Sequence, residues 1–273
     1  MRRLSAATAQ QALLILLSLV SLYPIWFTLQ TALKSSKSYA LDPTGLPREP
    51  TLANFHDLFA AMPFGLWTLN SVIVAFVSVA AATAISVFAA YAIAFGRFPG
   101  RLAFFNLNIA LVALPPVALV VPLFTMMLQM GLLNTLWSVI LVYTGLLVPF
   151  SIFFLVSFFR ELPHELVEAA VIDGASHIGI LFRIVMPLSL ATTFTLVTVN
   201  AIWVWNELLF ALVFLQDNNR RTVMAGLALF QGRYSTNEPL MMAGALLCVL
   251  PLLLLYLASQ RFFIRGMTAG IGK

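Results

Sequence analysis

Charged side chains are scarce in this sequence. Only 9% of its 273 residues are Asp, Glu, Lys or Arg, whereas about 25% of a soluble domain is charged. Hydrophobic residues make up 61% of the chain, and its mean hydropathy is +0.98. So little polar surface cannot cover a water-soluble globule, and we predict an integral membrane protein. The net charge of +5 is too small to indicate a nucleic-acid partner.

Cysteines, catalytic motifs and nucleotide-binding motifs are also scarce or missing. The single cysteine, Cys248, excludes an intramolecular disulfide and is interpreted as a small buried hydrophobe. His164 and Glu168 lie four residues apart, but two ligands are too few for a metal site. The sequence has no G-x-x-x-x-G-K-[S/T] motif, so we do not expect this chain to hydrolyse ATP by itself. We therefore expect no catalytic residue, no metal and no cofactor in the chain.

Long apolar runs are what the sequence has in abundance. A membrane-spanning helix needs about 20 apolar residues. The run from Leu102 to Phe159 contains no charge and is too long for one crossing, so it must turn back, and Gly131–Asn134 is the best turn. The first apolar run of the chain, from Leu4 to Leu33, is longer than the roughly 7–15 apolar residues of a signal peptide. This length favours an uncleaved first helix. An all-α protein with six spans is predicted, near residues 10–33, 66–95, 103–129, 135–158, 190–214 and 240–261.

The basic residues indicate an orientation for these spans. Six spans place both termini on one side of the membrane. If that side is the cytoplasm, nine of the fifteen Lys and Arg residues are inside and six lie in outer loops. The very short loop that contains Arg97 and Arg101 is the most informative, because short loops follow the positive-inside rule best. We therefore expect both termini in the cytoplasm.

Several prolines lie inside the predicted spans. Each removes one backbone hydrogen bond and tends to kink its helix, which membrane helices tolerate when neighbours satisfy the freed carbonyl. The kinks either shape a cavity and permit gating, or serve packing alone. The prolines are Pro115, Pro116, Pro122, Pro149 and Pro251.

One segment outside the spans, residues 160–190, concentrates acidic residues. Glu161, Glu165, Glu168 and Asp173 are four of the ten carboxylates of the chain. Gly174 can adopt a positive φ and end a first helix.

A second short helix is predicted to follow this glycine. Ser176 can cap it, and its apolar residues fall at i, i+3, i+4 and i+7 on one face. That face can lie on lipid headgroups, on the chain's own spans or in a groove of a partner. The residues of this apolar face are Ile178, Leu181, Phe182 and Val185.

The same segment resembles the EAA loop of binding-protein-dependent ABC importer permeases. The matching pattern is Glu168-Ala169-Ala170-x-x-Asp173-Gly174-Ala175, followed by Phe182, Ile184 and Pro187. The resemblance implies that Glu168, Ala169, Ala170, Asp173, Gly174, Ala175, Phe182 and Pro187 dock against a cytoplasmic ATPase subunit. Two positions depart from the pattern. Met186 replaces a leucine, and Ala191 replaces a second proline, which leaves the angle of approach to the fifth span open.

The resemblance extends over nearly the whole chain, which is similar to the permeases of the carbohydrate-uptake branch. It is carried by Tyr23-Pro24, Asn54-Phe55, Asn70-Ser71 and Trp205-Asn206-Glu207. The ending at Gly266–Gly270 resembles the tail of the maltose-type second permease subunit, which implies that Thr268, Ala269 and Gly270 reach toward the ATPase interface.

The resemblance implies a type I importer permease fold with residues 1–273 as one permease domain. It also implies alternating access for a sugar or oligosaccharide in the cytoplasmic membrane. The implied partners are a second permease subunit, an ATPase dimer that binds ATP and Mg²⁺, and an extracytoplasmic solute-binding protein.

The fifth span holds the candidates for a translocation path. A carboxylate in a membrane helix is costly and suggests function, and aromatic rings beside amides suit a sugar. The alternative is an aromatic belt with a snorkelled carboxylate and asparagines that join helices. The candidates are Asn200, Trp203, Asn206 and Glu207.

Three arginines of the predicted outer loops have two interpretations, and two other protein classes compete with the importer permease. Arg220, Arg221 and Arg233 either contact a binding protein or are simply solvated. An ion-coupled secondary transporter would need acidic residues inside the membrane, and Glu207 is the single one available. An intramembrane enzyme would need a paired catalytic set, which we do not find.

Overall fold

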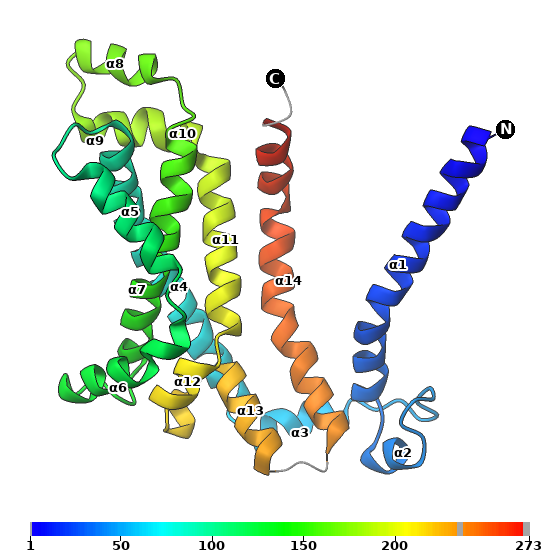
Figure 1. The fold of residues 1–273 in the computed structure, drawn as a ribbon. Helices are drawn as coiled ribbons and strands as arrows, with labels where there is room; N and C mark the ends of the chain where they lie inside the picture. The colour runs from blue at the N-terminus through cyan, green and yellow to red at the C-terminus, as the bar shows by residue number, and fades with distance from the viewer. Residues whose placement is uncertain (1, 234–236, 270–273) are drawn as a thin grey trace. The chain divides into compact units, whose positions relative to one another are not determined.

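The computed structural model of the chain describes residues 2–233 and 237–269, and in these ranges every regular element is a helix or a helical turn (Figure 1). This confirms the all-α prediction. The α-helices are α1 (Arg2–Ala32), α2 (Ser36–Leu41), α3 (Ala53–Ala61), α4 (Phe64–Phe95), α5 (Arg101–Val112), α6 (Val120–Gln129), α7 (Leu136–Phe159), α8 (His164–Ile172), α9 (His177–Ile180), α10 (Met186–Leu188), α11 (Leu190–Asn206), α12 (Leu209–Phe214), α13 (Val223–Arg233) and α14 (Glu238–Ala269).

The helices form two compact units. The first unit contains residues 1–65 and 226–251, and the second contains residues 66–225 and 252–273. In the second unit, α8 and α9 lie at one end and α6 and α12 at the other (Figure 1). The single permease domain over residues 1–273 stays a prediction.

The number of spans agrees with the prediction, but two of them are bent. Among the described residues, four helical stretches are long and apolar enough to cross a membrane alone: Gln10–Ala32, Phe64–Phe95, Leu136–Phe159 and Glu238–Gln260. Two bent pairs bring the count to six if each pair is one span. α5 and the segment Pro116–Gln129 meet at 95°, and the segment His177–Leu188 meets α11 at 80°.

The spans predicted over 103–129 and 190–214 are each broken into shorter helices. Pro115 and Pro116 interrupt the first, since neither residue has a backbone N–H to continue the helix. The second begins after a bend at Ser189 and ends at Asn206, before the short helix α12. The approach angle that the sequence left open is thus a sharp one.

The turn predicted between the third and fourth spans is confirmed. Gly131 has φ +67° and Asn134 has φ +59°. Both the backbone and the side chain of the left-handed Asn134 are held, because its N–H donates to the Phe214 carbonyl at 2.9 Å and its Oδ1 accepts from the Asp217 N–H at 2.8 Å. Side-chain and backbone bonds offset the strain of a positive φ in a residue other than glycine.

Two apolar clusters form the core of the second unit. Near α6 and α12, side chains such as Val74, Val139 and Phe214 are almost fully buried. Near α8 and α9, the cluster includes Phe159 and Leu196. These clusters fix both ends of α4 and α7, the two long helices that contribute to each cluster.

In the first unit, the end of α1 is fixed by polar side chains. Lys34 is only 1% exposed, and its Nζ donates to the carbonyls of Asp42 and Pro43 at 2.9 and 3.0 Å. The buried Asn54 donates from Nδ2 to the carbonyls of Ala32 and Lys34, both at 2.7 Å. The last carbonyls of a helix lack partners within the helix, so Asn54 supplies the missing donors.

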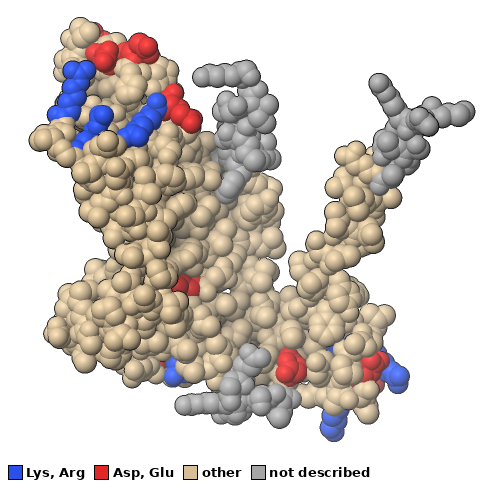
Figure 2. Space-filling model, viewed as in Figure 1, with Lys and Arg blue, Asp and Glu red and all other residues tan. Residues whose placement is uncertain are grey.

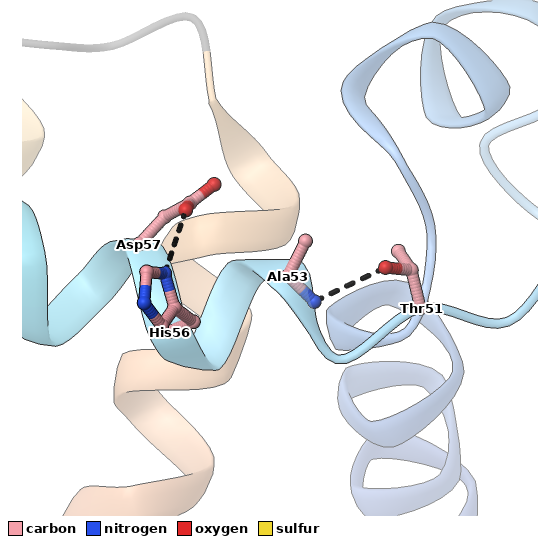
Figure 3. A network of polar contacts seen from close by, with 4 residues as sticks. All are labelled: Thr51, Ala53, His56 and Asp57. Atoms are coloured by element: carbon pink, nitrogen blue, oxygen red, sulfur yellow. Dashed lines mark hydrogen bonds and ion pairs between the residues drawn. The ribbon is translucent and has the colours of Figure 1, made fainter.

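The surface of α3 shows contacts of a weaker kind (Figure 3). Thr51 Oγ1 accepts from the Ala53 N–H at 3.1 Å where α3 begins. His56 Nδ1 lies 3.4 Å from Asp57 Oδ1, with side chains 84% and 62% exposed. Exposed pairs of this kind contribute little to stability.

We expect Asn54→Ala to lower the free energy of unfolding by about 1–3 kcal/mol, because two buried carbonyls lose their donor. The matched control is Asp57→Ala on the same helix, which should change it by no more than about 0.5 kcal/mol. Thermal unfolding of the purified protein in detergent measures both. Equal midpoints for the two variants would contradict the proposed role of Asn54.

Candidate functional site

The segment between α7 and α11 forms a helical elbow, residues Pro163–Leu188. α8 ends at Asp173, and Gly174 follows with φ +79°. The Ala175 N–H donates to the Ala170 carbonyl at 3.0 Å and the Gly174 N–H to the Val171 carbonyl at 3.0 Å, which is the paired pattern of a Schellman motif. The predicted glycine elbow is therefore confirmed.

The second half of the elbow begins at the predicted cap. Ser176 Oγ accepts from the Gly179 N–H at 3.2 Å where α9 begins. A π-helical turn, Leu181–Val185, then leads into α10. In this turn the Met186 N–H donates to the Leu181 carbonyl, five residues back. Pro187 follows directly and has no N–H to offer.

The structure divides the apolar face that the sequence placed on this second helix. Leu181 and Val185 are buried in the core of the unit, whereas Ile178 is 66% and Phe182 51% exposed. The predicted single face is wrong, because the wider π-turn shifts residues away from the regular helical spacing.

The predicted docking residues lie mainly on the exposed side of the elbow. Ala170 is half-buried, and the others are exposed. Ile172 beside them is 85% exposed, so the elbow presents apolar as well as acidic side chains. The docking role itself stays a prediction. The exposed residues of the predicted set are Glu168, Ala169, Asp173, Gly174, Ala175, Phe182 and Pro187.

Charged side chains gather at this end of the second unit (Figure 2). Arg97 lies 3.9 Å from Glu168, with side chains 92% and 68% exposed. The predicted topology puts both residues on one side of the membrane, but the sequence alone does not indicate that they pair. A pocket of about 730 Å³ lies beside them, lined by side chains that include Phe95, His164 and His177. Within the described ranges, no group of three or more His, Cys, Asp or Glu side chains could hold a metal ion.

A second cavity, of about 380 Å³, lies among the spans of the same unit. Pro116 and Pro149 line it together with Asn200 and Trp203. Asn200 is buried and donates from Nδ2 to Ser151 Oγ at 2.9 Å. The proline-bearing helices therefore border a cavity, as one of the two interpretations expected. Asn200 and Trp203 bring one amide and one indole ring to an otherwise apolar wall.

Asn206 and Glu207 do not belong to that lining. Asn206 Nδ2 donates to the Ile202 carbonyl of its own helix at 2.8 Å. The Glu207 carboxylate accepts from the Tyr143 hydroxyl and from the N–H groups of Phe210 and Ala211, the latter two at 3.1 and 3.4 Å. Glu207 thus caps the start of α12 instead of snorkelling to the membrane surface.

The partner of Glu207 was missed in the sequence. A tyrosine hydroxyl inside an apolar span needs an acceptor, and this need could have drawn attention to Tyr143. Its ring also meets that of Trp203 edge-on, with 5.8 Å between centroids. Tyr143 therefore joins the cap of α12 to the wall of the cavity.

The motif Asn70-Ser71 holds the loop Gln216–Thr222 and the start of α13. Asn70 Nδ2 donates to the carbonyls of Asn219 and Arg221 at 2.9 and 3.0 Å. Ser71 Oγ accepts from the Val223 N–H at 2.8 Å. We call these contacts, together with the bond from Trp67 Nε1 to the Asn218 carbonyl at 2.6 Å, the polar clamp.

The remaining candidates are placed as follows. Arg221 bonds within its own loop, to Asn218 Oδ1 and the Gln216 carbonyl at 2.9 and 3.0 Å, and Arg220 is exposed. The side chain of Arg233 is outside the described part of the chain. Thr268 and Ala269 belong to the last turn of α14, with side chains outside the description, and Gly270 lies outside the described residues altogether.

Comparison with known proteins identifies a matching family. The family model described as "Binding-protein-dependent transport system inner membrane component" matches residues 82–269. The sulfoquinovosyl glycerol transport system permease protein SmoH of Agrobacterium fabrum is 38% identical over 91% of this chain and 88% of that protein. The trehalose/maltose transport system permease protein MalG of Thermococcus litoralis is 34% identical over 95% of this chain and 94% of that protein.

Two further comparisons agree with this family. The melibiose/raffinose/stachyose import permease protein MelC of Bacillus subtilis is 33% identical over 92% of this chain and 91% of that protein. The fold is similar to a chain in the crystal structure of a bacterial ABC transporter involved in the import of the acidic polysaccharide alginate. The TM-score is 0.80 at 22% identity, over 94% of this chain and 96% of that one.

We expect Glu207→Ala to lower the free energy of unfolding by about 3 kcal/mol, because two backbone N–H groups and the Tyr143 hydroxyl lose their acceptor. Asn206→Ala, one residue away, is the control and should be nearly neutral, since this amide bonds only within its own exposed turn. Glu207→Gln keeps one acceptor oxygen and should lie between the two. Thermal unfolding in detergent ranks the three variants, and a neutral Glu207→Ala would contradict the cap.

Proposed function

The chain belongs to the inner membrane components of binding-protein-dependent transport systems, and from this membership we propose that it docks an ATPase through its elbow to import a sugar or oligosaccharide. The fold is that of an ABC importer permease, and the family is not enzymatic. The proposal concerns the partners, the substrate, the orientation and the residues that serve them.

The observation that carries the docking proposal is the exposed surface of the elbow. Ile172 and Ile178 are exposed beside Glu168 and Asp173, in a segment outside the long spans. Exposed apolar side chains next to charges are typical of an interface. Small residues such as Ala169 let the backbone of another subunit approach closely. A cytoplasmic ATPase subunit would receive this surface and would bind ATP and Mg²⁺, so that the present chain needs no cofactor.

The charges around the elbow support a cytoplasmic position for it and for both termini. Arg97 and Arg101 occupy a short loop beside it, and Arg160 precedes it. Such clusters favour the cytoplasmic side. On the opposite side, the loop of Arg220 and Arg221 would face an extracytoplasmic solute-binding protein.

A second permease subunit completes the proposed assembly. The apolar side chains of α1 from Leu13 to Trp26 are exposed in their own unit, and neighbouring helices or lipid must cover them. ATP-driven closure of the ATPase dimer would move the elbow as a lever and open the spans outward, and hydrolysis would reset them.

A sugar or oligosaccharide is the proposed substrate class. The names of the similar permeases refer to trehalose and maltose, to melibiose, raffinose and stachyose, and to sulfoquinovosyl glycerol. The cavity wall at Asn200 and Trp203 supports this class, because sugars stack on indole rings and bond to amides. An ion-coupled mechanism would need Glu207 free to exchange ions, but its carboxylate is occupied as a cap.

We expect Glu168→Lys to weaken ATPase binding by about tenfold or more, because an inverted charge in an interface costs several kcal/mol. Gly174→Val should act similarly by straining the φ of +79°. Co-purification with the ATPase and ATP hydrolysis by the complex measure both effects. Glu161→Lys, an exposed charge reversal outside the predicted docking set, should change neither. Normal ATPase binding by both elbow variants would refute the docking proposal.

The substrate proposal is tested first on the cognate solute-binding protein, whose thermal midpoint should rise with at least one sugar or oligosaccharide from a panel. Trp203→Ala should then reduce uptake of that sugar in proteoliposomes while ATPase binding stays normal. Trp137→Ala is the control, since Trp137 is 57% exposed and does not line the cavity. Stabilisation by amino acids or metal ions alone would contradict the assignment.

A further inference from the structure

Three aromatic side chains lie along one stripe of α4, near its end beside the elbow. Their positions are i, i+3 and i+7, which share one face of a helix. Each meets one ring of the elbow, and we call the three contacts the aromatic ladder. They are Phe88 with Phe182 at 5.9 Å, Tyr91 with His177 at 6.2 Å, and Phe95 with His164 at 5.3 Å between ring centroids.

The rings of the aromatic ladder meet edge to face, with interplanar angles of 75°, 65° and 68°. This is the favoured geometry of aromatic pairs. The middle contact also has a polar bond, because the Tyr91 hydroxyl lies 3.3 Å from His177 Nδ1. Phe95 stacks on Phe159 of α7 at 6.5 Å, so the last contact continues into the core.

Other links between α4 and the first half of the elbow are sparse. α8 buries one residue, Val167, and the pair Arg97–Glu168 is exposed. The pocket of about 730 Å³ lies at this junction, and Tyr91, His164 and His177 line it. The aromatic ladder therefore holds the elbow to α4 along the edge of a hollow, and in the second half of the elbow Leu181 and Val185 add core packing against α4.

The other end of α4 carries the polar clamp. Trp67, Asn70 and Ser71 hold the loop around Asn218–Arg221. Between clamp and ladder, α4 runs from Phe64 to Phe95 without an internal proline. By contrast, α11 begins after a bend of 80° and ends at Asn206 before a break. α4 therefore connects the two ends of the unit as one helix without an internal proline, whereas α7, which also reaches both ends, contains Pro149.

We propose that α4 transmits the movement of the elbow to the loop Gln216–Thr222, with the aromatic ladder as its input and the polar clamp as its output. This inference rests on the proposed docking of an ATPase at the elbow. A continuous helix fixed at both ends moves as one body, so a displacement of Phe182 and His177 reaches the loop through α4. Phe88, Tyr91, Asn70 and Ser71 are positioning residues in this scheme.

The experiment uses the full transporter, co-purified with its ATPase and placed in lipid nanodiscs. Gln216→Cys in a Cys248→Ala background provides the one thiol of this chain, in the exposed loop, and the labelling of this subunit is followed separately from that of its partners. Its reaction rate with a water-soluble maleimide is measured without nucleotide and with ATP and Mg²⁺. We expect ATP to change this rate on the order of fivefold or more, the lower range of allosteric coupling.

In complexes that keep normal ATPase binding, Phe88→Ala and Phe182→Ala should each abolish the ATP-dependent change in reporter rate, and the double variant should be no worse than either single one. Such non-additivity is the sign of two residues that act as a unit. Tyr91→Phe should reduce the change partly, because it removes the bond to His177 but keeps the ring. Phe88→Leu keeps the apolar volume and replaces Phe88→Ala if the latter does not fold.

The controls are one exposed residue on each side of the ladder. Leu188→Ala on the elbow and Phe76→Ala on α4 alter side chains that are 50% and 74% exposed and lie outside both the ladder and the proposed docking surface. Both should keep the parent response.

The outcomes separate this inference from the docking proposal. In two cases the route through α4 is wrong although docking stands. In the first, the ladder variants bind an ATPase that hydrolyses ATP and still show the ATP-dependent change in reporter rate. In the second, the parent binds the ATPase but shows no such change. If no ATPase co-purifies with the parent, the docking proposal itself fails.

Discussion

Backbone groups inside a bilayer find no water, so every interruption of a membrane helix must be satisfied by the protein itself. This constraint explains most of the polar side chains among the spans. Asn54 supplies donors to the end of α1, and Glu207 supplies acceptors to the start of α12. These residues make a broken helical architecture possible, and the bends in turn define the cavity and the elbow.

Features set by a few neighbouring residues could be predicted from the sequence. The membrane class, the six apolar segments and the turn at Gly131–Asn134 follow from hydropathy and local backbone preferences. The elbow at Gly174 and the cap at Ser176 are also local, since each depends on bonds within five residues. Local chemistry is therefore sufficient to predict the outline of the candidate docking site.

Features that depend on distant partners could not be predicted in the same way. The role of Glu207 depends on Tyr143, which lies on another span, and the burial of Leu181 depends on the core around α7. The bend at Ser189 has no proline or glycine at its apex to announce it. Helical spacing also failed at Ile178 and Phe182, because it assumes 3.6 residues per turn throughout.

The π-helical turn Leu181–Val185 has a consequence for the length of the chain. Such a turn contains one residue more than the α-helical turn that it replaces. Deleting that residue would restore a regular helix and rotate the preceding part of the elbow by about 100° about the helix axis. Glu168 and Ile172 would then face a different direction, although every side chain of the docking surface would be unchanged. A single-residue gap in an alignment at this position would thus mark permeases that present the same motif in another direction.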